Sequence, residues 1–543
     1  MTNAISLVPE PINEPVRSYA PGSHERATLQ KRLSELRAAP VEIPLVIGGK
    51  PVRTGKTLQI TEPHAHARLL GTAHLGGPRE VEAAVAAARA AAPGWAALPF
   101  EERASVFLRA ADLLAGGWRA TLNGSTMLGQ SKTCFQAEID AACELIDFFR
   151  FNVAFARQIH AWQPRSSPGM WNRCEYRELE GFVFAVTPFN FTSIAGNLPT
   201  APALMGNVVL WKPASTALYS GWFLMELFRA AGLPDGVINF VPGSGADIGD
   251  AVLASEHLAG IHFTGSTNVF NGMWHTVGEN VGKYRSYPRI VGETGGKDFV
   301  FAHPSADVPS LVTALVRGAF EYQGQKCSAA SRAYVPRSLW PKVRDGMREA
   351  LGKVSLGDPT DFCHFMAAVI DRNSFEKCKR YIEQARGGKG TTVVAGGECD
   401  GRTGWFVQPT VIESSDPKSV TMCEEIFGPI LTVHPYEDGK LDETVALCDS
   451  TSPYALTGAV FAQDRGAIAR LSTALRQSAG NFYVNDKPTG AVVGQQPFGG
   501  ARASGTNDKA GSLLNLVRWT SMRTIKENFV PPTDWRYPHM EAP

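Results

Sequence analysis

The chain has 543 residues, which is too long for one hydrophobic core and indicates about two to four folded units. Its 53 basic and 52 acidic side chains give a formal net charge of +1, so no overall field favours nucleic acid or an anionic membrane. Hydrophobic residues make up 44% and charged residues 19% of the sequence, which fits a soluble globular enzyme and excludes a disordered or fibrous protein.

The first part of the chain combines an arm with a group of helices. Residues 1–44 are Pro-rich and polar before a helical patch, and we expect an arm that lies on the surface or on a neighbouring subunit. Their first 30 residues lack the basic and then apolar pattern of a secretory signal. Apolar residues recur at helical spacing over 78–95, 100–116 and 133–160, which predicts three helices, the last of them long.

The next part of the chain alternates short apolar runs with helical segments. The runs cover 182–188, 207–213, 236–243 and 258–266, and they lack polar alternation. Such strands indicate a parallel sheet covered on both faces, whose ligands bind beyond the carboxyl ends of the strands. The uncharged stretch 181–211 is long enough to cross a bilayer, but its prolines and asparagines exclude a membrane helix.

A second alternating block follows. It starts with a strand at 298–304, continues through a helix over 308–324 and reaches a strand at 331–336, so we expect another α/β domain. Cys327 falls in the loop between this helix and the second strand.

Two segments outside these domains are candidates for contacts between subunits. Residues 164–184 and 515–528 are each predicted to form a protruding hairpin. Exposed strands of this kind commonly pair between subunits, so we expect a homodimer or a dimer-based oligomer.

The nine cysteines contain no CxxC pair, and no His/Cys cluster has the spacing of a zinc site. We therefore expect no metal site. An odd number of cysteines without a disulfide framework indicates a reducing compartment, and the predicted location is cytoplasmic.

Cys327 is a candidate nucleophile, although a lone cysteine is more often a small buried hydrophobe. As a catalyst it needs groups that favour the thiolate, stabilise an oxyanion and accept electrons or an acyl group. The small residues Ser328, Ala329 and Ala330 leave room for a substrate and for an oxyanion hole that uses the Cys327 amide.

Two other segments supply candidate partners for this cysteine. Glu293 in "IVGETGGKDF" is a solitary carboxylate in apolar surroundings, where burial would disfavour the charged form and suit a general base. A structural salt bridge is an equal alternative for Glu293. Asn190 in "TPFNF" is a candidate donor to an oxyanion, although an Asn that satisfies loop backbone is by itself the commoner case.

Three further segments suit a phosphate or a ribose. "VPGSGADIG" (241–249) and "FTGSTNVF" (263–270) each join a strand to a helix and offer backbone donors, although such turns are also common for structural reasons. Lys212 in "WKPAST" stands at a strand end, where its ammonium group suits ribose hydroxyls or a phosphate.

Together these segments resemble the aldehyde dehydrogenase superfamily over about residues 45–530. The resemblance rests on an ordered set: "PFNF", "LWKPAS", "FTGST", "ETGGK", "GQKCSAASR", "EEIFGP" and "PFGGARASGTND". Within the superfamily, "GQKCSAASR" and "GAVVGQQPFGGARASGTND" are most similar to the L-glutamate γ-semialdehyde dehydrogenases, also called 1-pyrroline-5-carboxylate dehydrogenases.

The resemblance implies an α/β fold with three parts. A Rossmann-like NAD-binding domain would comprise residues 45–163 and 182–296, and an α/β catalytic domain residues 297–490. A β-hairpin oligomerisation element with the C-terminal tail would comprise 164–181 and 506–543.

The resemblance also implies roles for individual residues. Cys327 would be the nucleophile, Glu293 the base, and Asn190 with the Cys327 amide the oxyanion hole. Contacts with NAD are implied for Thr187, Pro188, Lys212, Ser215, Gly245, Gly265, Ser266, Glu425 and Phe427. Substrate contacts are implied for Ser328, Gly490 and Ala491 at the carboxylate, Phe191 and Phe498 along the aliphatic chain, and Glu144 near the amino group.

Four positions are unusual or unexplained. Ala491 stands where many relatives have Ser, so carboxylate binding there would rely on backbone N–H groups. Ser215 stands where NAD-preferring relatives often have Glu, which leaves use of NADP open, although NAD is expected. Phe270 replaces a common Gly without a consequence that the sequence reveals. Lys326 either exerts a favourable field on the thiolate or carboxylate, or is a solvent-exposed charge.

The expected function is NAD-dependent oxidation of L-glutamate γ-semialdehyde, formed from 1-pyrroline-5-carboxylate, to L-glutamate in proline catabolism. The reaction would pass through a thiohemiacetal and a thioester on Cys327. A proline dehydrogenase is a further candidate partner, and no nucleic acid or membrane partner is expected. Two alternatives stay open: a relative that acts on another aldehyde or passes the acyl group to coenzyme A, and a non-enzymatic binding or scaffold protein on the same fold.

Overall fold

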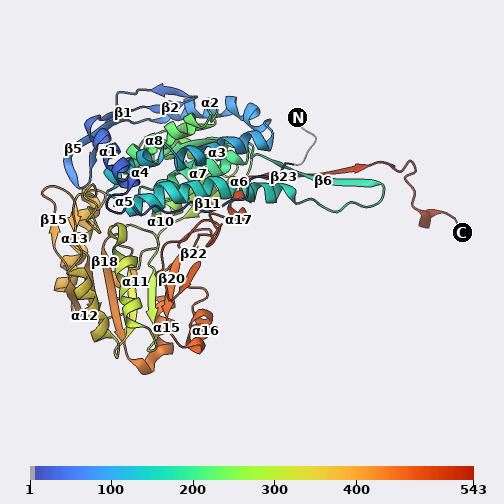
Figure 1. Cartoon of the computed structure of the whole chain (residues 1–543). Helices are drawn as coiled ribbons and strands as arrows, with labels where there is room; N and C mark the ends of the chain where they lie inside the picture. The colour runs from blue at the N-terminus through green and yellow to red at the C-terminus, as the bar shows by residue number, and fades with distance from the viewer. Residues whose placement is uncertain (1–5, 543) are drawn as a thin grey trace.

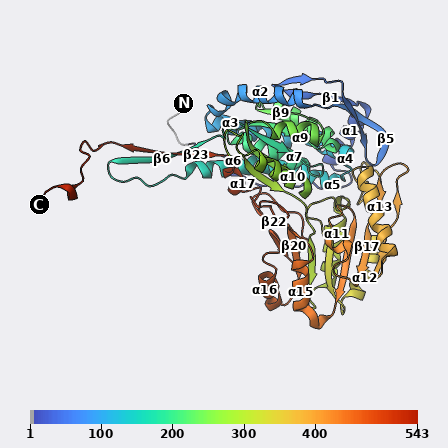
Figure 2. The ribbon, with the colours of Figure 1, turned by 180° about the vertical axis from the view of Figure 1, so that it is seen from behind.

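Two seven-stranded sheets organise the chain, and a two-stranded ribbon projects away from them (Figure 1). The computed structural model describes residues 6–542. The first sheet belongs to the blue-to-green part of the chain and the second to the yellow-to-red part, as the view from behind also shows (Figure 2). This architecture confirms the predicted α/β class with two domains built on largely parallel sheets.

The first sheet has the strand order β11-β10-β7-β8-β9-β2-β3. Its parallel strands are β7 (Phe182–Val186), β8 (Val208–Lys212), β9 (Ile238–Phe240), β10 (Leu258–Thr264) and β11 (Arg289–Glu293). An antiparallel edge is added by β2 (Leu45–Ile47) and β3 (Lys50–Val52). Nearly every side chain of β7, β8 and β10 is buried, as expected for a parallel sheet covered on both faces.

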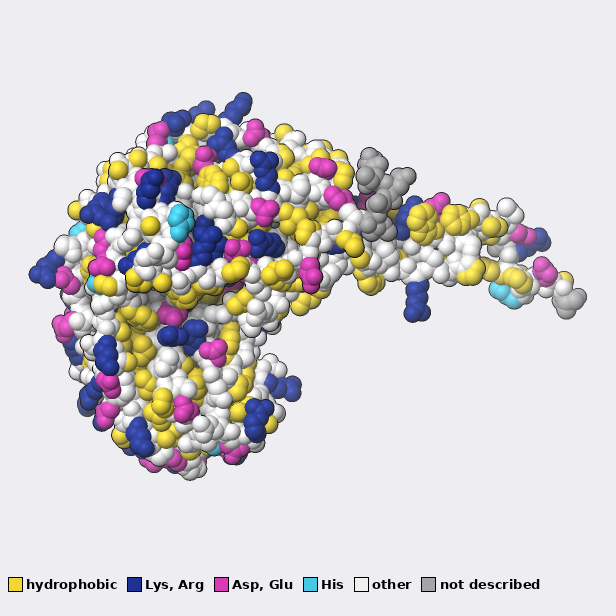
Figure 3. All heavy atoms as spheres, in the orientation of Figure 1, with side chains coloured by type: hydrophobic (Ala, Val, Ile, Leu, Met, Phe, Trp, Pro, Cys, Tyr) yellow, Lys and Arg dark blue, Asp and Glu magenta, His cyan; other side chains and the backbone are white. Residues whose placement is uncertain are grey.

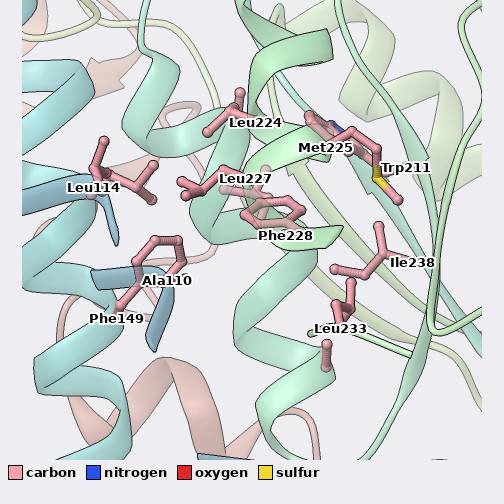
Figure 4. Packing of buried hydrophobic residues seen from close by; sticks show 14 of the residues in the cluster. Ala110, Leu114, Phe149, Trp211, Leu224, Met225, Leu227, Phe228, Leu233 and Ile238 are labelled. Atoms are coloured by element: carbon pink, nitrogen blue, oxygen red, sulfur yellow. The ribbon is translucent and has the colours of Figure 1, made fainter. Parts of the chain in front are cut away.

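Helices cover both faces of the first sheet. One face packs against α2 (Pro78–Ala96), α9 (Gly245–Leu253) and α10 (Thr267–Glu279). The other packs against α7 (Thr192–Leu204) and α8 (Leu218–Ala230), with α3 (Phe100–Ala115) and α6 (Leu145–Ala161) behind them. Figure 4 shows Phe228 of α8 among these layers, and its ring centroid lies 6.1 Å from Trp211 and 6.3 Å from Phe149. Phe228 thereby links the sheet to the outer helices.

Two helical features differ from the prediction. The long helix expected over 133–160 is divided, because α5 (Cys134–Ala137) leads into a π-helix, η1 (Glu138–Glu144), before α6. The helix α4 (Arg119–Gln130) escapes the sequence pattern, since its Gly, Ser and Thr residues have low helix propensity. Most of α4 is buried, so tertiary packing stabilises it.

Residues 6–44 contain more regular structure than an extended arm, and the part of the prediction that concerns residues 1–5 lies outside the described residues. The helix α1 (His24–Ala38) packs Leu29, Leu33 and Leu36 against α4. The strand β1 (Val41–Ile43) pairs with β5 (Ala65–His74), which also pairs with β4 (Thr57–Glu62). Residues 6–22 have no helix or strand.

The second sheet has the order β14-β17-β18-β13-β12-β20-β21. Its parallel strands are β12 (Phe299–Ala302), β13 (Arg332–Pro336), β17 (Thr410–Ser414), β18 (Ile430–Tyr436), β20 (Thr457–Phe461) and β21 (Asn481–Val484). The edge strand β14 (Thr391–Ala395) is antiparallel. One face packs against α11 (Val308–Phe320) and α12 (Trp340–Leu351), the other against α15 (Leu441–Ser450) and α16 (Arg465–Ala474).

The two segments predicted as separate hairpins form one ribbon instead. The strand β6 (Met170–Arg177) pairs antiparallel with β23 (Ser521–Asn528), from Met170 opposite Asn528 to Arg177 opposite Ser521. The prediction of two hairpins is wrong because local sequence marks a strand but not its partner. Figure 1 shows this ribbon extending beyond the domains.

The visible surface carries charges of both signs. Figure 3 shows Lys and Arg side chains interspersed with Asp and Glu over both domains, without a large area of one sign. Among residues 6–542, no helix combines the length and the apolar composition of a membrane span.

An ion network joins α1 to both domains. The Arg37 guanidinium pairs with Glu62 of β4 (Nε to Oε1, 2.8 Å) and with Asp358 (Nη2 to Oδ2, 2.7 Å). The Glu62 side chain is fully buried and also contacts His64 (Oε2 to Nε2, 2.9 Å). Burial opposes ionisation of Glu62, but hydrogen bonds from His64 and Arg37 outweigh it and lower the pKa.

Arg37→Ala is expected to lower the free energy of unfolding by about 3 kcal/mol, because the Glu62 carboxylate stays buried with one partner fewer. Since the pKa of Glu62 is lower in the folded state, the contribution is present near neutral pH and is lost as the pH falls below the ordinary carboxyl range. Urea titration measures the effect. Arg53→Ala, which removes an exposed pair with Glu42, is the control and should cost under about 1 kcal/mol. Equal losses in the two variants would contradict the structural importance of Arg37.

Candidate active site

The predicted cofactor residues gather at one edge of the first sheet. Most of them end or follow β7, β8 and β10: Thr187, Pro188, Lys212, Ser215, Gly265 and Ser266. The N–H of Gly265 donates to the carbonyl oxygen of Glu293 at the end of β11 (3.2 Å). The predicted base therefore lies at the same edge, where parallel sheets bind their ligands.

Two helices, α9 and α10, begin at this edge. Ser244 caps α9, and a Cβ added at the following residue, Gly245, would meet no atom within 4 Å. Ser266 caps α10 by accepting from the N–H of Val269 (3.4 Å). Helix N-termini present unpaired N–H groups and favour negative charge, so this edge fits the phosphates of a dinucleotide.

Lys212 supplies a cation beside these turns. Burial lowers the pKa of its ammonium group, and among residues 6–542 no carboxylate offsets this effect. A half-buried cation without an acidic partner fits a ligand that brings hydroxyl or phosphate groups. The residues present therefore fit NAD.

The loop that carries Cys327 leaves α11 through a strained turn. In the 3₁₀ turn Glu321–Gly324, Tyr322 and Gln323 have φ angles of 51° and 56°, which are uncommon for residues other than glycine. The Gln323 amide donates to the carbonyl oxygens of Ser131 (3.1 Å) and Ala368 (2.7 Å). These bonds fix the backbone just before the cysteine.

Cys327 and Glu293 are in direct contact. The thiol Sγ donates to Oε1 of Glu293 at 3.2 Å, and Cys327 is 8% exposed. Burial raises the pKa of Glu293 to about 7, opposed by the hydrogen bond from Cys327 and the charge of Lys509. Burial and the neighbouring Glu293 also raise the pKa of the thiol. Among residues 6–542, Glu293 forms no ion pair, so the geometry favours the general base over the salt bridge.

Asn190 lies against the same loop. Its side chain is 3% exposed, and Nδ2 donates to the carbonyl oxygen of Gln325, two residues before Cys327 (3.1 Å). This bond uses one of its two N–H groups. Lys326 is also buried and pairs with Glu321 (Nζ to Oε2, 3.1 Å), so the alternative of a solvent-exposed charge is wrong.

Glu425 and Phe427 approach this site from the second domain. Oε1 of Glu425 accepts from the N–H of Gly296 (2.9 Å), and a Cβ added at Gly295 would come within 2.6 Å of the carboxylate. Burial raises the pKa of Glu425. The Phe427 ring meets Phe189 edge to face at 5.7 Å. The sequence analysis did not select Phe189. It could not distinguish the roles of Phe189 and Phe191 in "PFNF", because the fold decides what each ring contacts.

One hydrogen bond links the two segments that are predicted to bind the carboxylate of the substrate. The hydroxyls of Ser328 and Thr489 share a hydrogen bond of 2.8 Å. Thr489 precedes Gly490, which has a φ of +100°, and Ala491. The loop therefore reaches the residue after the cysteine. Nothing in the sequence marks Thr489 except its place before Gly490.

Glu144 and the two phenylalanines that are predicted to contact the substrate lie on separate segments. Glu144 ends η1, and its Oε2 accepts from Ser193 Oγ (3.0 Å). Burial, with the charge of Asp140, raises the pKa of Glu144 to about 8. Phe191 directly precedes α7, whereas Phe498 bridges to Ala510 in the C-terminal part. Passage of a substrate between the two rings stays a prediction.

A buried ion pair that sequence reasoning missed holds the start of α7. Lys132 is fully buried, and its Nζ lies 2.7 Å from Oδ2 of Asp140 and 4.0 Å from the ring centroid of Phe191. Asp140 accepts the N–H groups of Thr192 (3.0 Å) and Ser193 (2.9 Å). The carboxylate thus fixes the helix N-terminus beside Phe191. The sequence does not show this arrangement, because it depends on how η1 and α7 pack against each other.

Phe270 has a packing role next to the candidate base. Its ring stacks on Phe263 with a centroid distance of 5.3 Å. A Cβ added at Gly292 would come within 2.2 Å of the Phe270 ring. The ring therefore supports β11 one residue before Glu293 and requires glycine there.

Comparison with known proteins gives consistent matches over nearly the whole chain. The model of the aldehyde dehydrogenase family matches residues 52–525. The chain is 52% identical to the delta-1-pyrroline-5-carboxylate dehydrogenase, mitochondrial, of Dictyostelium discoideum, over 99% of this chain and 97% of that protein. It is 51% identical to the Bos taurus protein of the same name, over 97% of this chain and 94% of that protein.

A solved structure matches equally well. The Delta-pyrroline-5-carboxylate dehydrogenase from Mycobacterium tuberculosis bound with NAD has a TM-score of 0.96 and 56% identity to this chain, and the match covers 100% of both chains.

These relatives contradict the predicted cytoplasmic location. The Dictyostelium discoideum and Bos taurus proteins are both named mitochondrial, so the prediction is wrong. Free cysteines indicate only a reducing compartment, and the mitochondrial matrix is reducing as well, so the cysteine pattern has no power to separate the two.

The predicted family resemblance is confirmed. Because the family match spans most of the sequence and relatives share about half of its residues from end to end, the chain belongs to the aldehyde dehydrogenase family.

Proposed function

We propose that the protein oxidises L-glutamate γ-semialdehyde, the open form of 1-pyrroline-5-carboxylate, to L-glutamate with NAD. The observation that carries this proposal is the hydrogen bond between Ser328 and Thr489, because it places the loop of Gly490 and Ala491 beside the cysteine. A carboxylate site so close to a nucleophile suits an aldehyde that also bears a carboxylate. The names of the relatives support the same substrate.

The substrate binds through both of its charged groups. Ser328 Oγ and the backbone N–H groups of Gly490 and Ala491 donate to the α-carboxylate. Glu144, whose pKa of about 8 leaves it largely protonated in the free enzyme, receives the ammonium group. A nearby cation favours the ionised carboxylate, so substrate binding itself charges Glu144.

The first half of the reaction forms a thioester. As Cys327 Sγ bonds to the aldehyde carbon, the thiol proton passes along the existing hydrogen bond to Glu293. The oxyanion of the thiohemiacetal accepts from Asn190 Nδ2 and from the N–H of Cys327. When bound, NAD supplies the hydride acceptor for this carbon. The residues at the sheet edge would hold NAD together with Glu425 of the second domain, and Lys212 and Glu425 would contact its ribose hydroxyls.

The second half releases L-glutamate. After Glu293 has lost the first proton to solvent, its carboxylate takes a proton from water as the water oxygen bonds to the thioester carbon. The carbon–sulfur bond then breaks, Cys327 leaves as thiolate, and the same two donors stabilise the oxyanion of the tetrahedral intermediate.

Assembly and supply of substrate are further parts of the proposal. The ribbon of β6 and β23 exposes Trp171 (52%) and Met522 (48%), which suits contact with a second copy of the chain in a dimer-based oligomer. Because 1-pyrroline-5-carboxylate is the product of proline oxidation, a proline dehydrogenase is the proposed partner that supplies it.

A steady-state assay with 1-pyrroline-5-carboxylate and either NAD or NADP tests the function. We expect the highest kcat/KM with NAD, and lower values with succinate semialdehyde and propanal. A preference for another aldehyde, or for coenzyme A over water as the acyl acceptor, would replace the proposed substrate. Lack of turnover together with an iodoacetamide-resistant Cys327 would favour the non-enzymatic alternative.

Thr489→Val is expected to raise KM for glutamate semialdehyde about fivefold, the effect of one lost hydrogen bond, because Ser328 loses the partner that orients it. The value of kcat/KM for propanal, which has no carboxylate, should stay unchanged. Thr313→Val on the exposed face of α11 is the matched control, since its hydroxyl contacts only the Pro309 carbonyl. A loss that is equal for both aldehydes would contradict a role of Thr489 in carboxylate binding.

A further inference from the structure

The extended segment 12–19, which we call the N-terminal arm, reaches the loop that carries Gly490 and Ala491. We call residues 489–496 the carboxylate loop. The Nδ2 group of Asn13 donates to Asp147 Oδ2 (2.8 Å) and to the carbonyl oxygen of Val493 (2.9 Å). Its Oδ1 accepts from Nε2 of Gln495 (3.0 Å). Both N–H groups and the oxygen of this amide are therefore engaged, two of the three bonds with the carboxylate loop.

The helix α6 contacts both the N-terminal arm and the carboxylate loop. Asp147 is 3% exposed and also accepts from the backbone N–H of Glu14 (2.7 Å), so it holds two successive arm residues. One turn along α6, Phe151 lies against the carboxylate loop at Gly494, where an added Cβ would come within 2.2 Å of the ring. Residues four apart lie on one face of a helix. The same face of α6 thus contacts the loop directly and through Asn13.

The carboxylate loop is closed by its own bonds. The N–H of Val492 donates to Oε1 of Gln496 (2.9 Å), and the N–H groups of Gln495 and Gln496 donate to the Val492 carbonyl (3.0 Å each). At its other end, Thr489 bonds to Ser328. A displacement at Val493 or Gln495 will therefore move the turn as a unit and shift Gly490 and Ala491 relative to Cys327.

The arm is fixed firmly enough to act as a support. The Glu14 carboxylate pairs with Arg119 and with Arg150 (Oε2 to Nη1, 2.8 Å). Further along, the N–H of Arg17 (2.9 Å) and the hydroxyl of Tyr19 (2.8 Å) donate to Glu138, which is fully buried. These bonds hold the arm at Glu14, directly after Asn13, and further along at Arg17 and Tyr19 against η1.

We propose that Asn13 is a positioning residue through which the N-terminal arm holds the carboxylate loop in register with Cys327. The arm thereby contributes to the selection of an aldehyde with an α-carboxylate over aldehydes without one. This inference rests on the proposed function, because it assigns the carboxylate to Gly490 and Ala491. Loops without strand pairing move easily, so a contact from outside the loop, such as that of Asn13, directly affects how the loop binds the substrate carboxylate.

Kinetics of Asn13→Ala on the full-length protein test the inference. We expect KM for 1-pyrroline-5-carboxylate to rise about five- to thirtyfold, the range for one to two lost hydrogen bonds, with kcat little changed. For propanal, kcat/KM should stay within about twofold of the wild type, since no carboxylate has to be placed. Ser18→Ala is the control in the same arm, because Ser18 Oγ makes only a local 3.4 Å contact with the N–H of Ala20.

A second variant and a second measurement make the result decisive. Gln495→Ala removes only one of the two bonds and should give a smaller rise in KM, and adding it to Asn13→Ala should produce less than the product of the two effects. Hydrogen exchange of the amides in 490–496 should speed up in Asn13→Ala and not in Ser18→Ala.

Two results would overturn the inference: an unchanged KM for 1-pyrroline-5-carboxylate in Asn13→Ala, or equal losses with both aldehydes. Failure of the proposed function is distinct, because the wild type itself would then not oxidise 1-pyrroline-5-carboxylate. In that case unchanged exchange in 490–496 would also refute the positioning role.

Discussion

Cys327→Ala is expected to lose at least about 10³-fold in kcat/KM for 1-pyrroline-5-carboxylate, because the proposed thioester forms on the Cys327 sulfur. NAD binding should persist, since the proposed contacts with the cofactor come from the strand ends and from Glu425. NADH formation measures the first quantity and titration calorimetry the second. The substitution removes one buried sulfur atom, so the fold should be retained.

Cys448→Ala is the matched control for this variant. Cys448 is fully buried as well as being distant from Glu293 in the sequence, and it packs from α15 against the second sheet. Its replacement should leave activity at the wild-type level. Comparable losses in the two variants would show that the effect comes from cavity formation, and would contradict the role of Cys327 as nucleophile.

Glu293→Gln is expected to slow steady-state turnover by about 10²- to 10⁴-fold while a burst of NADH remains. The thioester can still form, more slowly, because water must take the thiol proton. Its hydrolysis loses the base that activates water, so the thioester accumulates. Stopped-flow measurement of NADH gives both phases. A burst amplitude near one NADH per subunit is expected, and equal loss of burst and turnover would refute Glu293 as the base for hydrolysis.

The pH profile gives a second check on Glu293. Its pKa is raised to about 7, so the carboxylate that accepts a proton from water predominates above pH 7 and is lost below it. Steady-state turnover of the wild type should therefore rise with pH through about 7. In Glu293→Gln this dependence should disappear, whereas a Glu→Gln change at exposed Glu349 should leave the profile intact.

Much of the fold follows from local sequence. Apolar runs without polar alternation mark β7, β8 and β10 because strands buried on both faces have no solvent side. Their helices follow from the period of apolar residues, and the segment order indicates the family. Local patterns fail for α4 and for the partners of β6 and β23, because burial and strand pairing between distant segments decide them.

The sequence suggests which residues are candidates for the site, but it does not show how they are arranged in space. A cysteine among small residues and a carboxylate among apolar ones suggest Cys327 and Glu293. Only the fold brings them to 3.2 Å across 34 positions of the chain. It likewise joins Thr489 to Ser328 and Asn13 to Val493, and no pattern in the sequence marks these pairs.

By itself, then, the sequence determined the α/β class and the strand edge that suits NAD, because periodicity is a local property, and the order of its motifs indicated Cys327 as the candidate nucleophile. The tertiary structure decided which side chains meet. It placed Phe189 with Phe427 and the N-terminal arm against the carboxylate loop. Contacts between residues far apart depend on how the sheets and helices pack, and that packing is a property of the whole chain.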